Sequence, residues 1–290
     1  MAGWFPGDRD VQTTTLATQT GPRRTTHLLS DGTYCEVQGT GPAIIFIHGL
    51  GLDRTVWEKQ VEALSPTLKT VVYDLIGHGK TARIEAEHTV ELYAAQLVRM
   101  MDALGIDRAV IVGFSLGGLI ARGFALKHPE RLSGLALVNT WFQRTQAEER
   151  LVVERMEITA QTGLEASVGP ALIRWFSDAY RAKSPETLKR IEVMLRANDH
   201  TSYLSAYRVA VEPGTPAVDA IETIAVPTLV MTCTDDRGNS PGMAMRMCEN
   251  IEGSELVILP GLRHMALVES PPLVNEPLAR LAARAAASTA

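Results

Sequence analysis

Short apolar runs rich in β-branched residues recur along the chain, and most of them are separated by helical patterns. Because these runs lack polar alternation, they predict strands buried on both faces, as in a parallel sheet covered by helices. We expect such strands at residues 43–47, 69–74, 109–113, 135–139, 227–233 and 255–259. The covering helices are expected at 55–64, 90–104, 116–128, 241–251 and 273–287. A hairpin with an Asp31-Gly32 turn precedes them. The pattern predicts an α/β fold with a mostly parallel central sheet.

The strand pattern stops between residues 140 and 226. Two long stretches here, "AEERLVVERMEITAQTG" and "SPETLKRIEVMLRAN", have helical spacing, and no strand separates them. We interpret residues 140–226 as a helical lid inserted after the sixth strand, and residues 27–139 and 227–290 as the core. Residues 1–26 contain no apolar segment typical of a signal peptide. We expect them to form an extended N-terminal arm, either disordered or packed on a partner subunit.

One serine stands where a buried strand turns into a helix. In "AVIVGFSLGGLIARGFAL", residues 109–126, a glycine lies two residues to each side of Ser115. A serine on so sharp a turn adopts strained backbone angles, and side chains in place of Gly113 and Gly117 would collide. The short Gly-x-Ser-x-Gly pattern also occurs in ordinary Gly/Ser connections. Here the pattern lies between a predicted strand and a predicted helix, which favours a nucleophile elbow that exposes the serine hydroxyl above the sheet.

A serine nucleophile needs a general base and an acid that orients the base. His264 follows the last predicted strand and Asp236 follows the strand before it, so both are expected at the carboxyl edge of the sheet. Asp235 competes with Asp236 by one position, and both aspartates could instead cap the helix near Pro241. The chain order Ser115, Asp236, His264 accompanies this elbow in α/β-hydrolase sheets, so we predict these three as the triad.

Attack on a carbonyl creates an oxyanion, which backbone N–H groups must stabilise. We predict the N–H of Leu116, directly after the serine, and the N–H of Leu50, in "HGLGLDRTVW", as the two donors. His48 and Asp53 are expected to brace the Leu50 loop by hydrogen bonds, and His48 precedes the serine in the wrong order for the base. The lid residues expected to bind substrate are Trp141, Phe142 and Trp175.

Composition narrows the class of function. A formal charge of −5 and a pI near 5.8 give no basic surface for nucleic acid or for an acidic membrane, and no apolar run has the length of a membrane span. The three cysteines, Cys35, Cys233 and Cys248, have no metal-ligand spacing and predict neither disulfides nor zinc, which fits a reducing cytoplasm. "DLIGHGKT" ends like a P-loop but lacks its first glycine, so we do not expect nucleotide binding. We therefore expect no cofactor, and the cysteine spacing predicts no metal.

These motifs together resemble the α/β-hydrolase superfamily over residues 27–287, through "HGLG", "YDLIGHG", "GFSLGG", "CTDD" and "PGLRHMALVESP". Within it, "GFSLGG", "LVNT", "IRWFSDAYRAKSPETLKRIEVMLRAN" and "SYLSAYR" are similar to 3-oxoadipate enol-lactonases, which open a lactone in aromatic-compound catabolism. The resemblance implies the α/β-hydrolase fold and assigns the same triad and oxyanion donors by position. The chain departs from residues common in these enzymes at Cys233, Arg237, Arg263, Trp141 and Phe142.

We therefore expect a cofactor-independent serine hydrolase that cleaves a small ester or lactone through an acyl-enzyme. Carbon–carbon bond hydrolases and perhydrolases share the serine elbow and stay open, as does a non-catalytic ligand receptor, although the complete triad argues against a receptor. If the substrate carries a carboxylate, a lid cation should neutralise it. Arg144, Arg174 and Arg208 are the candidates, with a solvated surface charge as the alternative for each. The sequence leaves open whether the chain forms a homo-oligomer.

Overall fold

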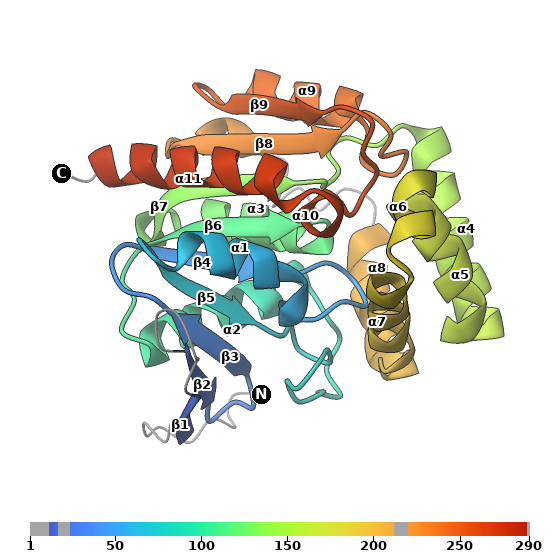
Figure 1. Cartoon of the computed structure of the whole chain (residues 1–290), viewed down its shortest axis with the longest axis horizontal. Helices are drawn as coiled ribbons and strands as arrows, with labels where there is room; N and C mark the ends of the chain where they lie inside the picture. Colours follow the sequence, from blue (N-terminus) through green and yellow to red (C-terminus); the bar gives the residue numbers. More distant parts are fainter. Residues whose placement is uncertain (1–11, 17–23, 212–219, 289–290) are drawn as a thin grey trace.

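A single mixed sheet runs through the molecule. The computed structural model describes residues 12–16, 24–211 and 220–288, with only the backbone of 12–16. The sheet has nine strands in the order β1-β2-β3-β5-β4-β6-β7-β8-β9. Their bounds are β1 (Gln12–Leu16), β2 (Arg24–Leu28), β3 (Tyr34–Gln38), β4 (Ala43–Ile47), β5 (Lys69–Tyr73), β6 (Ala109–Phe114), β7 (Leu132–Val138), β8 (Thr228–Cys233) and β9 (Glu255–Leu259). The predicted mostly parallel sheet is confirmed, since every pairing from β5 through β4 to β9 is parallel (Figure 1).

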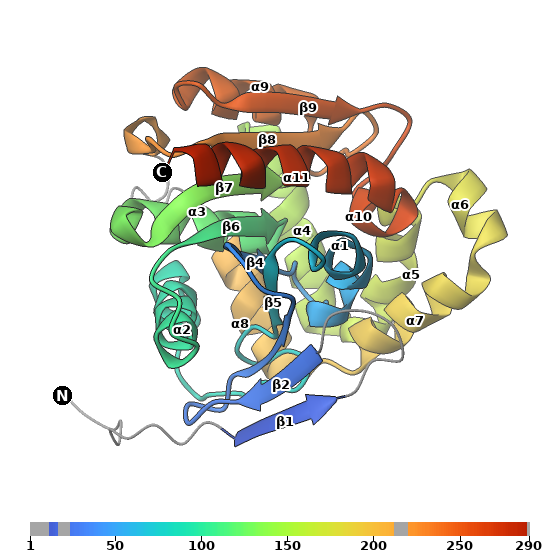
Figure 2. The same ribbon diagram turned by 60° about the vertical axis from the view of Figure 1, so that its left-hand side comes forward.

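Alternate residues of the central strands enter two apolar cores, one on each face of the sheet. In β4, Ile45 and Ile47 belong to one core, and Ile44 and Phe46 belong to the other. This alternation explains why the strand sequences are continuously apolar. The first core is covered by α2 (Val90–Ala103), α3 (Leu116–Lys127) and α9 (Pro241–Asn250), and the second by α1 (Glu58–Leu64), α10 (Ala266–Glu269) and α11 (Pro271–Ala287). Figure 2 shows the sheet between these two helix layers.

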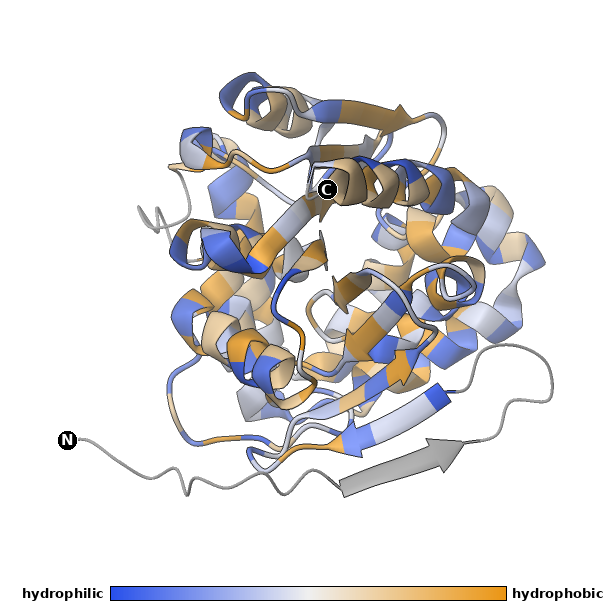
Figure 3. Ribbon diagram, turned by 90° about the vertical axis from the view of Figure 1, so that its left-hand side faces the viewer, coloured by the Kyte–Doolittle hydropathy of each residue, from blue (hydrophilic) through white to orange (hydrophobic). Residues whose placement is uncertain are grey.

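The covering helices bury one face and expose the other. In α2 the buried residues recur three and four positions apart, at Val90, Tyr93, Ala94 and Leu97, as an amphipathic helix requires. The helix begins at Thr89, whose side chain accepts a hydrogen bond from the N–H of Leu92. Figure 3 shows hydrophobic colour on the strands and mixed colour on the helices around them. The expected covering helices are therefore present, with ends shifted by a few residues.

Among the described residues, five α-helices lie between β7 and β8, in the segment interpreted as a lid. They are α4 (Gln146–Thr162), α5 (Leu164–Trp175), α6 (Asp178–Lys183), α7 (Pro185–Arg196) and α8 (His200–Val211). The first begins with a capping box between Thr145 and Glu148, which ends the loop after β7. The five helices lie together on one side of the molecule, beside the ends of the central strands (Figure 1). Because β1 precedes the predicted hairpin, they follow the seventh strand of the structure.

The N-terminal part differs from the expectation in three places. The hydrophobic pattern does not predict β1, because "QTTTL" is mostly polar, but this segment pairs antiparallel with β2. In the hairpin, Leu28 pairs with Tyr34, so residues 29–33 form the connection instead of a two-residue Asp31-Gly32 turn. The loop closes internally, since the N–H of Thr33 donates to Asp31 Oδ1 at 3.0 Å. Residues 24–26, which we assigned to the arm, belong to β2, because they pair with β3. The other residues of the predicted arm, 1–11 and 17–23, lie outside the described residues.

Candidate active site

Ser115 lies at the turn from β6 into α3. Its backbone has φ 54° and ψ −116°, a strained conformation for a residue with a Cβ atom. A Cβ on Gly113 would lie 2.2 Å from the carbonyl oxygen of Gly117, and a Cβ on Gly117 would lie 2.3 Å from that of Ile47. Both positions therefore require glycine. The N–H of Ser115 donates to the Val138 carbonyl at 3.0 Å, which ties the turn to β7. This is the geometry expected of a nucleophile elbow.

His264 and Asp236 form a buried pair on two neighbouring loops. His264 Nδ1 donates to Asp236 Oδ2 at 2.7 Å, and the two residues are 6% and 4% exposed. Asp236 Oδ2 also accepts from Asn139 Nδ2 at 2.9 Å, and Oδ1 accepts from the N–H of Asn239 at 3.1 Å. Asp235, the alternative acid, is exposed. Of the two aspartates, the structure places Asp236 on the histidine.

Electrostatics favour the charged form of the Asp236 carboxylate. Burial acts to raise the pKa of Asp236, but the charge and hydrogen bond of His264, with the hydrogen bonds from Asn139 and Asn239, lower it overall. An ionised carboxylate accepts the Nδ1 proton of His264 and fixes the tautomer that leaves Nε2 as the basic atom. The pair therefore has the orientation that a general base requires.

His264 lies beside the nucleophile elbow. Its ring packs on Phe114, the residue before Ser115, with ring centroids 4.7 Å apart, and Trp175 of α5 lies 5.9 Å from it. Within the described residues, no hydrogen bond joins Ser115 Oγ to His264. Such contacts are often long without substrate and tighten when it binds. The structure brings the three predicted triad residues to one edge of the sheet.

The two predicted oxyanion donors border the serine. Leu116 is the first residue of α3, where the helix dipole favours negative charge. The Leu50 loop lies against the same turn, because a Cβ on Gly49 would lie 3.1 Å from the Cβ of Ser115. Among the described residues, neither Leu50 nor Leu116 donates a backbone hydrogen bond to the protein. Both N–H groups are placed where an oxyanion hole is expected.

Comparisons with known proteins agree with this geometry. The chain matches the model of the alpha/beta hydrolase fold family over residues 42–271. It belongs to this family. A putative carbamate hydrolase RutD from a Caulobacter species is 31% identical, covering 84% of this chain and 93% of the relative. An (E)-2-((N-methylformamido)methylene)succinate hydrolase from Acinetobacter baylyi is 26% identical, covering 82% and 89%. The solved structure of the enol-lactonase from Burkholderia xenovorans has a TM-score of 0.78 at 26% identity, covering 87% and 97%.

A histidine in this α/β-hydrolase braces the loop that carries Leu50. The N–H of Leu75 donates to His48 Nε2 at 3.0 Å, so the proton is on Nδ1, which donates to the Gly49 carbonyl at 2.8 Å. Burial lowers the pKa of His48, against the opposite effect of Asp74. Both ring nitrogens are used in backbone hydrogen bonds, so His48 has no atom left to act as a base. Asp53, also expected to brace the loop, accepts from the N–H and hydroxyl of Thr55.

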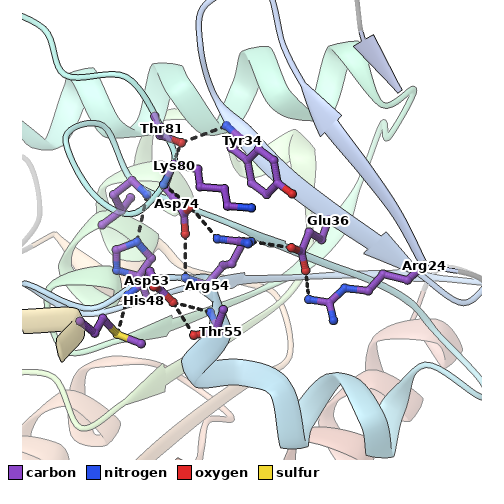
Figure 4. A network of polar contacts seen from close by, with 12 residues as sticks. Arg24, Tyr34, Glu36, His48, Asp53, Arg54, Thr55, Asp74, Lys80 and Thr81 are labelled. Atoms are coloured by element: carbon purple, nitrogen blue, oxygen red, sulfur yellow. Dashed lines mark hydrogen bonds and ion pairs between the residues drawn. The ribbon is translucent and has the colours of Figure 1, made fainter. Parts of the chain in front are cut away.

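A closed ionic network lies next to this brace (Figure 4). Arg54 Nε donates to Glu36 Oε1 at 2.7 Å, and Arg54 Nη1 donates to Asp74 Oδ2 at 2.9 Å. Glu36 also pairs with Arg24, and Asp74 accepts from the N–H of Lys80 at 2.8 Å. Because Asp74, Arg54 and Glu36 are all buried, the network fixes the turn after β5. The turn is structural, as expected for "DLIGHGKT".

The three predicted substrate-binding residues of the lid occupy different environments. Trp141 and Trp175 are half-buried, whereas Phe142 is fully buried in the core beneath the Arg122 guanidinium, 5.4 Å from its ring centroid. Phe142 therefore has no surface to offer a substrate in this structure. Its apolar ring fills part of the core that also contains the buried side chains of α3. The sequence does not reveal this role, because an aromatic residue after a strand can equally well face a pocket.

The sequence reasoning missed the two asparagines that hold Asp236. Asn139 follows β7 directly and has φ 46°, a conformation that asparagine adopts more readily than most residues. Its place at a strand end was a signal of a functional position. Asn239 Nδ2 lies 3.2 Å from His264 Nδ1 and 3.5 Å from Asp236 Oδ2. Both side chains complete the surroundings of the Asp236–His264 pair.

Across residues 24–211 and 220–288, no group of three histidine, cysteine, aspartate or glutamate side chains is arranged to hold a metal ion. Cys35, Cys233 and Cys248 are free thiols. No described helix is both long enough and apolar enough to cross a bilayer.

Proposed function

We propose that this α/β-hydrolase is a serine hydrolase that cleaves a small carboxylic ester or lactone through an acyl-enzyme. The observation that carries the proposal is the buried His264–Asp236 hydrogen bond of 2.7 Å, at the same sheet edge as the strained turn at Ser115. A buried carboxylate that orients a histidine beside a partly accessible serine is the arrangement of acyl-transfer enzymes. The overall hydrolase assignment is given by the family.

The proposed reaction has two steps. Ser115 Oγ attacks the carbonyl carbon while His264 Nε2 accepts its proton, and Asp236 stabilises the imidazolium. The N–H groups of Leu50 and Leu116 stabilise the oxyanion. His264 then returns the proton to the leaving oxygen as the carbon–oxygen bond breaks. A water that gives its proton to His264 attacks the acyl-enzyme and releases the acid and the serine.

Enol-lactones are the lactone class that we propose to test first. The lid sequence resembles enol-lactonases, and the enol-lactonase structure is related over most of its length. In such a ring the leaving group is an enolate that stays attached to the acyl chain. His264 therefore protonates the enolate oxygen while the opened chain is still bound to Ser115. The RutD relative supports a carbamate as the second candidate, because the same groups can attack a carbamate carbonyl.

The test compares kcat/KM for 3-oxoadipate enol-lactone and a short p-nitrophenyl ester, in the native protein and in Ser115→Ala. We expect Ser115→Ala to lower turnover by about four to six orders of magnitude. Near-normal turnover in this variant would exclude the serine mechanism. Ester turnover without lactone turnover would retain the triad and exclude the enol-lactone.

Other readings of the same site are separated by further measurements. Failure of Ser115 to react with a fluorophosphonate, together with no turnover, would favour a ligand receptor. A carbon–carbon bond hydrolase would use Ser115 with a carbon leaving group, and a perhydrolase would use Ser115 with hydrogen peroxide in place of water as the acyl acceptor. Turnover of the matching substrates would identify either activity. The cytoplasmic location and the lack of nucleic-acid and membrane partners stay predictions, and the oligomeric state stays open.

A further inference from the structure

The loop that carries Leu50 closes as a tight turn. The N–H of Leu52 donates to the carbonyl of Gly49 at 3.2 Å, so residues 49–52 form a β-turn, called here the Leu50 turn. Gly51 has φ 72°, and Leu50 is not among the described residues with positive φ, a combination typical of a type II turn. The closing bond does not use the N–H of Leu50. The direction of this N–H therefore depends on how the turn is held.

The first residue of the Leu50 turn is held by the core of the molecule. His48 Nδ1 donates at 2.8 Å to the carbonyl of Gly49, the same carbonyl that closes the turn. A Cβ on Gly49 would lie 3.1 Å from the ring of Phe114 and 3.1 Å from the Cβ of Ser115. This side of the turn therefore lies directly against the end of β6.

The other side of the turn contacts α7 and α8. Asn198, two residues after the end of α7, donates from Nδ2 to the carbonyl of Gly51 at 2.8 Å. Just after the turn, the N–H of Asp53 donates to the sulfur of Met194 at 3.2 Å. A Cβ on Gly51 would lie 2.7 Å from the ring of Tyr203 in α8. Two hydrogen bonds and a close packing contact thus join the loop to these helices.

The amide of Asn198 faces only acceptors. Its Nδ2 lies 3.0 Å from the carbonyl of Met194 and 3.0 Å from that of Leu195, besides the bond to Gly51. Because carbonyl oxygens only accept, the group that faces all three must be the NH2 group, which fixes the orientation of the amide. Carbonyls at the end of a helix need partners outside the regular helical pattern. One side chain therefore both caps α7 and binds the Leu50 turn.

Water has access to this contact. An open cavity of about 260 Å³ is lined by Leu52, Met194 and Asn198, among other residues. Asn198 itself is half-buried. If its amide is removed, water can bind the carbonyl of Gly51 in its place. The fold therefore does not depend on this one bond, and its loss affects mainly how firmly the turn is held.

We propose that the end of α7 positions the N–H of Leu50, through Asn198 and, to a smaller extent, Met194. The inference rests on the proposed function, in which this N–H stabilises the oxyanion. Asn198 touches no reacting atom and is a positioning residue. Without its amide, the turn keeps the bonds to the carbonyl of Gly49 but loses the one that orients its other side. An oxyanion donor is effective only when it is preorganised, so the loss weakens binding of the transition state more than binding of the substrate.

The alternative is that Asn198 only caps α7, and the next residue offers a matched control. Asp199 Oδ1 accepts from the N–H of Ser202 at 2.9 Å and so caps the start of α8. Among the described residues, the side chain of Asp199 binds Ser202 and Arg83 and forms no hydrogen bond with the Leu50 turn. Asp199→Ala therefore removes a helix cap at the same bend of the chain and leaves the turn untouched.

The test measures kcat and KM for p-nitrophenyl acetate, or for the enol-lactone if only the lactone is hydrolysed. It also measures the inhibition constant of 1,1,1-trifluoro-2-butanone, whose adduct with a serine carries an oxyanion. Asn198→Ala should lower kcat and weaken inhibition by about tenfold each, and KM should stay within about twofold. Removal of an oxyanion donor costs about a hundredfold or more, and here the donor is only loosened. Asp199→Ala should leave all three quantities within about twofold.

Met194→Leu is a second variant with a smaller expected effect. It removes the sulfur that accepts from the N–H of Asp53 and keeps a side chain of similar volume. We expect kcat to fall by about threefold with unchanged KM, since a thioether is a weak acceptor. If Asn198→Ala does not fold, this variant decides the inference, which an unchanged kcat would overturn.

The outcomes separate this inference from the proposed function. Turnover by the native protein, with kcat and inhibition unchanged in Asn198→Ala, would overturn the inference and leave the hydrolase. An equal fall of kcat in Asp199→Ala would also overturn it, because loosening of the helix ends would then explain the effect. If the native protein hydrolyses neither the ester nor the lactone, the proposed function is overturned and this inference with it.

Discussion

Two buried aspartates follow strands of the same sheet, and they differ in their partners. Asp74, after β5, accepts from the side chain and the backbone N–H of Arg54. Asp236, after β8, accepts from the ring of His264. Arginine keeps its proton throughout the working pH range, so the Asp74 cluster is fixed, whereas histidine can gain and lose one. Both residues are aspartates that follow a strand of the sheet. They differ in the residue that donates to them, and this difference distinguishes the structural carboxylate, Asp74, from the candidate catalytic one, Asp236.

The histidines of the two clusters differ in the same way. His48 uses both ring nitrogens in bonds to the backbone. His264 donates from Nδ1 to Asp236, and among the described residues its Nε2 forms no hydrogen bond. A base needs one nitrogen anchored and the other available, and only His264 of these two satisfies that requirement.

The largest expected effect is on the Asp236 side of the comparison. Asp236→Asn should lower kcat by about four orders of magnitude, because an amide no longer fixes the Nδ1–H tautomer or stabilises the imidazolium. The measurement is kcat/KM on the neutral p-nitrophenyl ester. Asp235→Asn is the matched control and should retain activity, since Asp235 is exposed. A larger loss in Asp235→Asn would show that the acid is assigned to the wrong residue.

On the Asp74 side, the expected loss is in stability. Asp74→Asn removes one charge from a buried pair and leaves the nearly buried Arg54 without its full compensation. We expect the free energy of unfolding to fall by about 3–5 kcal/mol, measured by urea denaturation. Glu91→Gln, which breaks an exposed pair with Lys127, should cost about 1 kcal/mol or less. Equal effects in the two variants would show that the Asp74 network is not a structural centre.

The sequence was sufficient where a signal is local. Ser115, Asp236 and His264 each follow a strand by a few residues in the sequence, and the strands are found from their apolar runs. Gly113 and Gly117 can also be explained from the sequence, because a side chain at either position would collide with the backbone of so sharp a turn. These features need no knowledge of which strands are neighbours.

The sequence was insufficient where partners come from different parts of the chain. Asn139 reaches Asp236 only because β7 and β8 are adjacent in the sheet. Phe142 and Trp141 look alike as lid aromatics, and only the packing shows that one fills the core. For the arginines, helical spacing alone does not say that Arg144 packs on the Trp141 ring and Arg208 faces water.

The buried histidines near Asp74 give a pH dependence of stability. Burial lowers the pKa of His78 to about 3 and also lowers the pKa of His48, from an ordinary value of 6.5. Below pH 6.5 these histidines bind protons in the unfolded chain and not in the folded protein. Their contribution to the free energy of unfolding is therefore fully present above pH 6.5 and is lost as the pH decreases. Each histidine contributes up to about 1.4 kcal/mol per pH unit. His78→Gln should reduce the slope of unfolding free energy between pH 6.5 and 5, and an unchanged slope would contradict this origin.

The His264 side has a further support that His48 lacks. Arg263 Nη1 donates to the carbonyls of Ile173 and Phe176 at 2.9 and 2.8 Å. On the other side of the histidine, the N–H of Met265 donates to the carbonyl of Trp175 at 2.9 Å. Both neighbours of the histidine are therefore tied to the end of α5, so this helix helps to position His264.

The smallest expected effect follows from this tie. Arg263→Ala should lower kcat on the neutral ester by about tenfold with little change in KM, since lost hydrogen bonds of a charged group loosen His264 rather than the substrate. Arg263→Lys should restore part of kcat, because an ammonium can still reach a carbonyl. Arg237→Ala, an exposed change on the Asp236 loop, should have no effect. If Arg263→Ala lowers the melting temperature and leaves kcat unchanged, the contact only packs the lid, and the position of His264 depends on Asp236 and Asn239 alone.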